Sequence, residues 1–209
     1  MPIFTTEVPY RDLYTWDVHV RKQDNDGAPS GSGTKSPLML SKNEVWHQIL
    51  LTNTTNLPWT TGAAMIMQGN QPLAQELLTY TPPKDEVRVP VTVSVDTRGS
   101  LMEKEVGREL KSLQWDGANY ARIDKEIKLD LCNNKPVEIE TEITLRVGGK
   151  VDKASHDGEV TIDAFNDADW VKYNGHPAVN NSSTVVWKAK LKPGENFEPI
   201  VNYHHFTRH

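Results

Sequence analysis

Alternation of apolar and polar side chains with a period of two is the feature of this sequence that most limits its fold. In residues 87–95, VRVPVTVSV, every second residue is valine, and Arg88, Thr92 and Ser94 lie between them. All the valines then share one face of an extended strand, because successive side chains of a strand point to opposite faces. Pro90 also lies between the valines and has no amide hydrogen to donate, so we expect this strand at a sheet edge or a bulge.

A second alternating stretch predicts a β-hairpin. Residues 120–131, YARIDKEIKLDL, and residues 136–147, PVEIETEITLRV, are each apolar at alternate positions, with CNNKP between them. Asn133 and Asn134 tolerate the left-handed conformations that tight turns need. We therefore expect the two segments to pair directly, which would bring Lys128 close to the glutamates of the second strand.

Six more segments have the composition of strands, and helix signals are few. These segments are residues 15–22, 44–52, 62–67, 158–164, 183–191 and 197–206. Residues 71–78, QPLAQELL, have the composition of a short helical turn. Residues 101–110, LMEKEVGREL, fit a helix or a strand, and we favour a strand because they follow the valine-rich strand. Residues 24–36 have the Gly- and Ser-rich composition of a flexible surface loop.

Many short strands separated by turn signals predict an all-β fold, an immunoglobulin-like or larger antiparallel β-sandwich. With 209 residues, the chain is long enough for one large unit or for two packed β-sandwich halves. A boundary, if the chain has one, is placed at residues 114–120. It would separate an N-terminal β region, 1–113, from a C-terminal β-sandwich region, 114–209. The sequence has no internal repeat of fixed period.

Composition argues against several classes of function. The formal net charge is −5, and neither half of the chain is rich in lysine and arginine, so we expect no nucleic-acid partner. Cys132 is the only cysteine and forms no intrachain disulfide. No segment approaches the roughly 20 apolar residues of a membrane span. The N-terminal residues lack the pattern of a signal peptide, so export would require a signal upstream in a longer protein.

No catalytic motif is assembled in the sequence. Cys132 lies beside a turn without a surrounding motif, and neither a G-x-S-x-G elbow nor a glycine-rich phosphate loop is present. The C-terminal HHFTRH places His205 and His209 on one face of an extended strand and His204 on the other. A zinc site needs three or four converging ligands, and no second cluster is visible, so we expect an exposed terminal strand there. We assign no catalytic, cofactor-binding or metal-binding residue.

Aromatic side chains in loops are the candidate contacts for a ligand or partner. Trp59 follows a proline in a loop, and Trp170 and Tyr173 lie in the polar stretch DADWVKYNGHP. Exposed rings at these positions would stack on a sugar or anchor a protein partner. Packing beneath their own loop is the competing interpretation. Trp187 instead shares an apolar strand face with Val185 and is expected in the core.

Residues 50–96, 129–151 and 181–206 resemble a known bacterial family. The opening pattern consists of Leu51, Asn53, Thr55, Pro58, Thr60 and Gly62. The later motifs are Tyr80, Thr81 and Pro82, then Trp187, Leu191, Pro193, Gly194 and Glu195, and finally Tyr203. Together they look like the C-terminal domain of unknown function in mucoidy-inhibitor-A-like bacterial proteins. The resemblance implies a β-sandwich-rich domain that usually follows other domains, with no established enzymatic activity and no catalytic residues.

The sequence thus predicts a non-catalytic β-sandwich module, structural or protein-binding, within a larger bacterial protein. The resemblance suggests an envelope-associated or exported protein. Its expected partner is another protein or the remainder of its own longer chain, and no cofactor is expected. One alternative is a carbohydrate-binding module that uses the loop aromatics to hold a glycan. Another is a hydrolase or metalloenzyme, which a pocket joining His204 or His205 to carboxylates would favour. A third is a module that self-associates through an edge strand.

Overall fold

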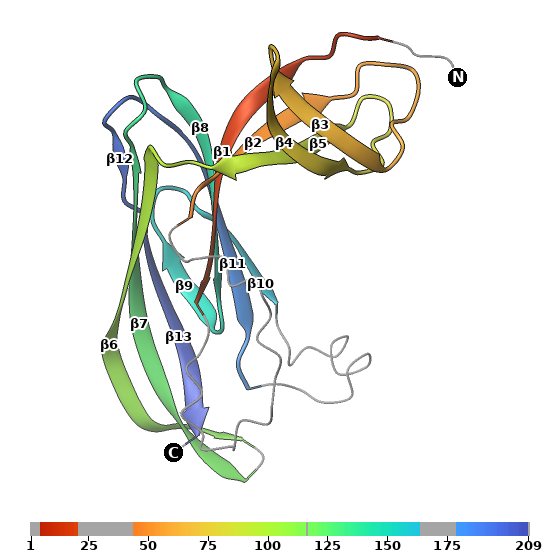
Figure 1. The fold of residues 1–209 in the computed structure, drawn as a ribbon. Helices are drawn as coiled ribbons and strands as arrows, with labels where there is room; N and C mark the ends of the chain where they lie inside the picture. The colour runs from red at the N-terminus through yellow and green to blue at the C-terminus, as the bar shows by residue number, and fades with distance from the viewer. Residues whose placement is uncertain (1–4, 21–43, 116, 164–178, 209) are drawn as a thin grey trace, which may run out of the picture.

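The computed structural model describes residues 5–20, 44–115, 117–163 and 179–208, and all regular secondary structure in these ranges is β-strand (Figure 1). The predicted all-β class is confirmed. The strands are β1 (Tyr10–Val20), β2 (Trp46–Thr52), β3 (Gly62–Gln68), β4 (Gln71–Leu78), β5 (Glu86–Val93), β6 (Thr97–Trp115), β7 (Ala118–Asn133), β8 (Ile139–Val147), β9 (Lys150–Ala154), β10 (Glu159–Asp163), β11 (Ser182–Leu191), β12 (Asn196–Phe197) and β13 (Ile200–Arg208).

Two large sheets make up most of the molecule. One has the strand order β10-β11-β8-β1-β2-β5, and the other has the order β12-β7-β13-β9 with β6 paired to β7. The pairing of β1 with β8 is parallel, whereas the other strand pairs of the two sheets are antiparallel. The first half of β1 pairs with β2 and its second half pairs with β8, so this strand joins the two parts of its sheet.

The hydrophobic core lies between the two sheets. It is built from the inward-facing residues of β1, β7, β8, β11 and β13, which alternate with outward-facing polar residues. Trp16 of β1 is fully buried, and Trp187 of β11 is 2% exposed. Val185 beside it is also fully buried, so the predicted core position of Trp187 is confirmed.

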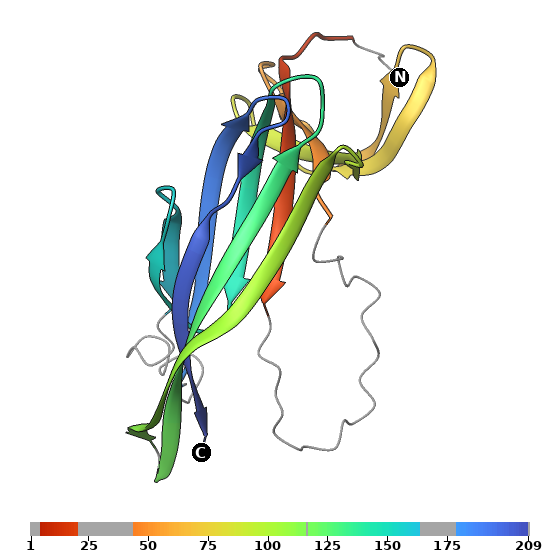
Figure 2. The same ribbon diagram turned by 90° about the vertical axis from the view of Figure 1, so that its left-hand side faces the viewer.

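Two hairpins extend away from this core. β3 and β4 form a separate two-stranded sheet that projects from one end of the sandwich (Figure 1). The long strands β6 and β7 pair along most of their length, and their turn reaches beyond the opposite end (Figure 2). Of these two hairpins, only β3 and β4 form an isolated one, because β7 stays paired with β13 up to the pair Tyr120↔Arg208, close to the β6–β7 turn.

The valine-rich strand lies where its proline predicts. β5 is the last strand of its sheet, and its register with β2 shifts between the pairs His47↔Thr92 and Gln48↔Pro90. Both alternatives for Pro90 are thus correct, since the strand is at an edge and carries a bulge. Residues 101–110 also form the favoured strand, as part of β6.

The hairpin predicted from residues 120–131 and 136–147 is wrong. Both segments are strands, but β7 belongs to one sheet and β8 to the other. The neighbours of β7 include β6 and β13, while β8 lies between β1 and β11, so the connecting turn crosses from sheet to sheet. Accordingly, the Lys128 ammonium lies 2.5 Å from Glu198, and not beside the glutamates of β8.

The expectation of a helical turn at residues 71–78 is also wrong. This segment is β4, which pairs along its length with β3. Its Leu, Ala, Gln and Glu residues have high helix propensity, but pairing between strands overrides this weak local preference.

Residues 114–120, the predicted boundary, lie at the end of the β6–β7 hairpin, with residue 116 outside the described residues. Strands from before and after this segment are neighbours in both sheets, as in the pairs β1–β8 and β6–β7. The division of the chain into two regions stays a prediction. In the part of the chain that the structure describes, no helix is long and apolar enough to span a membrane.

Candidate functional site

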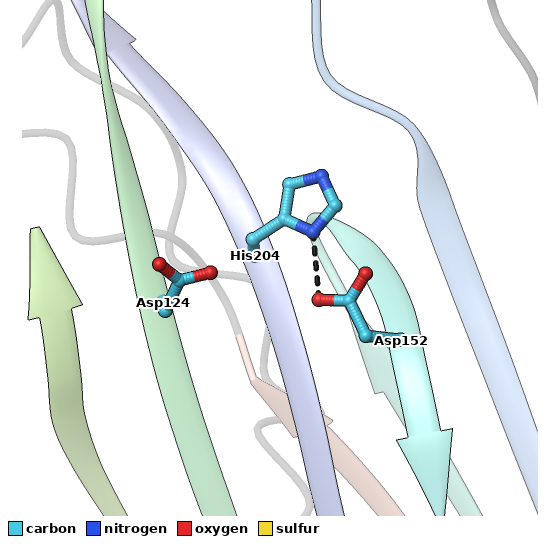
Figure 3. Close-up of side chains that lie close together, drawn as sticks. All are labelled: Asp124, Asp152 and His204. Carbon is cyan, nitrogen blue, oxygen red and sulfur yellow. Dashed lines mark hydrogen bonds and ion pairs between the residues drawn. The ribbon is translucent and has the colours of Figure 1, made fainter. Parts of the chain in front are cut away.

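A histidine and two aspartates meet on the face of the five-stranded sheet that points away from the core. His204 of β13 lies directly opposite Asp124 of β7, and β9 on the other side of β13 supplies Asp152 (Figure 3). The core residues Val201 and Tyr203 face inward on β13, so the next side chain, His204, points outward. One nitrogen of the imidazole and one oxygen of each carboxylate lie within 4.8 Å of one another.

Arg122 of β7 is the fourth member of this cluster. Its Nε lies 2.8 Å from Asp124 Oδ1, and its Nη2 lies 3.6 Å from Asp152 Oδ2. The same Asp152 oxygen lies 2.7 Å from His204 Nδ1. The His204 side chain is only 10% exposed, whereas both carboxylates are more than one-third exposed. A shielded imidazole therefore borders two carboxylates that are accessible to water and to ions.

A hollow of about 270 Å³ lies beside the imidazole. Its lining includes His204, Lys150, Trp115, Asn180 and Phe206. The ring of Phe206 meets that of His204 edge-on, with the centroids 5.6 Å apart. The Asn180 side chain both donates to the Phe206 carbonyl and accepts from its amide, at 2.8 and 2.6 Å. These contacts hold one wall of the hollow in place.

A second polar group lies on the inner face of the same sheet. The Tyr203 hydroxyl donates to Glu103, whose carboxylate also lies 3.2 Å from the Lys125 ammonium. Burial raises the pKa of Tyr203 far above its ordinary value, and the hydrogen bond to Glu103 adds to this effect. The group satisfies polar atoms at the margin of the core, which is a structural role.

A charged groove of about 430 Å³ crosses the outer face of the six-stranded sheet. Arg88 contacts both carboxylate oxygens of Glu142, at 2.6 and 3.0 Å, and this hydrogen bonding lowers the pKa of Glu142. Glu140 lies between Arg11 and Lys190, at 3.3 and 2.8 Å. Because these charges neutralise each other locally, the groove has no strong preference for an anion or a cation.

The β3–β4 hairpin exposes a face of large apolar side chains, which we call the apolar hairpin face. Its residues, with their exposed fractions, are Met65 (62%), Met67 (51%) and Leu77 (59%). Residues 63 and 65 lie opposite residues 77 and 75, so period-two alternation puts Met65, Met67 and Leu77 on one side of the hairpin. Leu73 is the extra residue of a bulge between the pairs Ile66↔Ala74 and Met67↔Pro72, so alternation does not assign it to this face.

The aromatic residues selected from the sequence do not form a common site in the described structure. Trp59 is half-buried, and its backbone exchanges two hydrogen bonds of 2.9 Å with Thr81. Trp170 and Tyr173 lie outside the described residues. The role of these three residues as contacts therefore stays a prediction.

The expectation of an exposed C-terminal strand is wrong for the adjacent histidines. His204 is 8% exposed and His205 is 7% exposed. His204 faces Asp124 and Asp152, which the sequence did not single out, whereas His209 lies outside the described residues. Asp124 and Asp152 look like ordinary solvent-side residues of alternating strands, and only the register between β7, β13 and β9 brings them to His204.

Comparison with known proteins gives no relative. A scan against protein-family models, a search of curated proteins and a search of solved structures each found no match. The resemblance to mucoidy-inhibitor-A-like proteins therefore stays a prediction.

Proposed function

We propose that this chain is a non-catalytic β-sandwich module that binds another protein through the apolar hairpin face. One observation carries the proposal: three large apolar side chains of β3 and β4 are between 51% and 62% exposed on one side of a projecting hairpin. Contiguous apolar patches on soluble proteins commonly mark interaction sites. Burial of these side chains by a partner would remove them from water.

The chemistry of the hairpin suits a protein partner. Met65 and Met67 have flexible, polarisable side chains that adapt to varied apolar surfaces. A two-stranded hairpin is only marginally stable alone, so a partner that covers it would also stabilise it. The bound surface would then be a strand pair laid flat on an apolar region of the partner.

The hairpin also has few of the charges that commonly protect a free strand edge. Glu76 is the only charged residue in β3 and β4, whereas solvent-exposed edge strands usually carry lysine or other charges. In the described part of the chain, β3 pairs with no strand other than β4. Its outer edge is available for strand addition, a common mode of recognition between proteins.

Site-specific photocrosslinking in cells of the source organism tests the proposal. In one variant, a benzophenone amino acid replaces Gln75, which lies opposite Met65 on the hairpin. In the control variant, it replaces Thr161 of the edge strand β10. We expect a defined cross-linked product from position 75 and not from position 161. The paired substitutions Met67→Glu and Leu77→Glu should abolish that product.

The mass of the product distinguishes a second copy of the chain from a different protein. Identical products from both positions, or no product from position 75, would contradict the proposal. The same would hold if the paired substitutions left the product unchanged. Circular dichroism of the doubly substituted chain checks that the sandwich is still folded, because the substituted side chains lie outside the core.

A further inference from the structure

We propose that Asp124, Asp152 and His204 bind one divalent transition-metal ion, with Zn²⁺ as the preferred ion. An imidazole nitrogen and two carboxylate oxygens are ligands that zinc accepts in proteins. Here the three atoms already lie within 4.8 Å of one another, on three adjacent strands of one sheet. The site is separate from the apolar hairpin face and does not depend on the function proposed for it.

The strand register at Asp152 directs this carboxylate toward the imidazole. The pairing of β13 with β9 passes from Asn202↔Lys153 to Tyr203↔Val151, so Asp152 is the extra residue of a β-bulge. A bulge bends its strand and re-aims a side chain, and bulges are frequent beside functional sites. The bulge therefore accounts for the position of Asp152 Oδ2, 2.7 Å from His204 Nδ1.

A second irregularity lies on the opposite side of the cluster. The pairing of β6 with β7 passes from Glu105↔Lys125 to Gly107↔Asp124, which leaves residue 106 as the extra residue. Gly107 then lies directly opposite Asp124, and a Cβ atom at this position would be 3.2 Å from Asp124 Oδ2. The missing side chain leaves space around the carboxylate.

The coordination needs only small movements of side chains. Zinc lies about 2.0–2.2 Å from nitrogen and carboxylate ligands, so tetrahedral ligand atoms are about 3.3–3.5 Å apart. The Asp124 and Asp152 side chains are 36% and 39% exposed. Solvent therefore leaves room for both to move once a metal ion replaces their contacts with Arg122 and His204. The ion would take the place of the proton between His204 Nδ1 and Asp152. Three protein ligands leave a fourth position for water.

Substitution of Arg122 distinguishes a metal site from a cluster that only pairs charges. Its guanidinium contacts both carboxylates, so it competes with a bound cation for the same negative charge. In a metal site, Arg122→Gln removes a competing positive charge and tightens metal binding. In a cluster that only pairs charges, the same substitution creates no affinity for metal.

Isothermal titration of the full, untagged chain with ZnCl₂ tests the proposal. We expect one ion per chain and about a tenfold or greater loss of affinity in His204→Gln and in Asp152→Asn. Arg122→Gln should tighten binding severalfold. His47→Gln is the matched control, because His47 also lies close to an aspartate, 2.6 Å from Asp12, but belongs to no three-ligand group among the described residues.

Thermal unfolding provides a readout that does not depend on titration heats. Zn²⁺ should raise the melting temperature of the natural chain and of His47→Gln, but not that of Asp152→Asn, because a ligand that binds only the folded state stabilises it. If His204→Gln does not fold, zinc binding by Asp152→Asn tests the proposal instead, because the Asp152 side chain is partly exposed and its substitution leaves the core unchanged. Absence of saturable binding would overturn the proposal. So would binding that persists in Asp152→Asn or that depends on His209.

Discussion

Asn53 and Asn133 make the same set of hydrogen bonds at the ends of two strands that belong to different sheets. Both side chains are fully buried, and each amide nitrogen reaches three backbone carbonyl oxygens. For Asn53 Nδ2 these are the oxygens of Leu57, Thr81 and Pro82, at 3.0, 3.0 and 3.2 Å. For Asn133 Nδ2 they are the oxygens of Val137, Leu191 and Lys192, at 3.0, 2.9 and 3.2 Å.

The backbone completes the same arrangement at both places. The amide of Lys84 donates to the carbonyl of Asn53, and that of Gly194 donates to the carbonyl of Asn133, each at 2.7 Å. Lys84 and Gly194 both have left-handed backbone angles, with φ of 71° and 75°. Each asparagine therefore ties the end of its strand to a distant turn, and the two sheets use the same device.

Asn133→Ala should strongly destabilise the fold. The substitution leaves three backbone carbonyls without their donor, and a buried group without a partner costs about 1–3 kcal/mol. We expect the free energy of unfolding to fall by about 2–4 kcal/mol on this basis. Asn53→Ala should act similarly, because its hydrogen bonds are equivalent. Urea denaturation followed by circular dichroism measures both changes.

Two further substitutions test the cause of this loss. Asn133→Asp conserves shape but replaces the donor with a second acceptor, so it should destabilise at least as much as alanine. Asn56→Ala removes an exposed asparagine from the adjoining loop and should have little effect. Equal losses for Asn56→Ala and Asn53→Ala would show that the buried hydrogen bonds are not responsible.

Lys84→Gly should stabilise the protein, and Gly194→Ala should destabilise it. Both positions have a positive φ, which costs a residue with a Cβ atom roughly 1 kcal/mol relative to glycine. No atom lies within 4 Å of a Cβ built on Gly194, so only the backbone conformation opposes alanine. We expect opposite changes of up to about 1 kcal/mol in unfolding experiments. Changes of the same sign would contradict the equivalence of the two turns.

The local patterns of the sequence predict most strands because each depends on neighbouring residues. The burial of Val87 and Val89 and the core position of Trp187 follow from period-two alternation. The edge position of Pro90 follows from its missing amide hydrogen. The expectation that all five valines share one face of the strand is wrong for Val95, which lies beyond the end of β5 and is 79% exposed. Pairing between strands does not follow in the same way. β7 and β8 both alternate and flank a turn, but alternation does not specify which sheet a strand joins.

The candidate metal site could not be predicted for a related reason. Asp124 and Asp152 are each one of many polar residues on alternating strands, and their proximity to His204 depends on strand order and on one bulge.

The repeated asparagine arrangement is visible in the sequence, since Pro-Lys-Asp (83–85) and Pro-Gly-Glu (193–195) follow the two asparagines. The intervening lengths differ, so the device has no fixed period.

Gly99→Ala should destabilise the core by steric overlap. Gly99 of β6 lies against the buried ring of Trp16, and a Cβ atom there would be 2.5 Å from Trp16 Cε2. Overpacking of this kind typically costs about 1–3 kcal/mol. Gly148→Ala is the matched control, because no atom lies within 4 Å of its Cβ position. A loss of stability in Gly148→Ala as large as in Gly99→Ala would refute the steric explanation.

Arg88→Gln should remove part of the acid dependence of stability. Hydrogen bonding to the Arg88 guanidinium lowers the pKa of Glu142 in the folded chain. The unfolded chain therefore binds a proton at a higher pH than the folded chain does. The stabilisation is fully present above the ordinary glutamate pKa and is lost as the pH falls through the lowered value. Because Arg88 is 49% exposed, we expect about 0.5–1 kcal/mol at pH 7.

The difference in unfolding free energy between the natural chain and Arg88→Gln should shrink as the pH falls from 7 to below the pKa of Glu142. Arg108 provides the matched control, because its pair with Glu105 on β6 also lowers a carboxyl pKa, but the Glu105 side chain is 40% exposed, whereas that of Glu142 is 14% exposed. Solvent screens such a pair, so Arg108→Gln should change neither the stability nor its pH dependence measurably. If the difference for Arg88→Gln were instead constant with pH, the arginine would act by packing its aliphatic stem and not through the charge of Glu142.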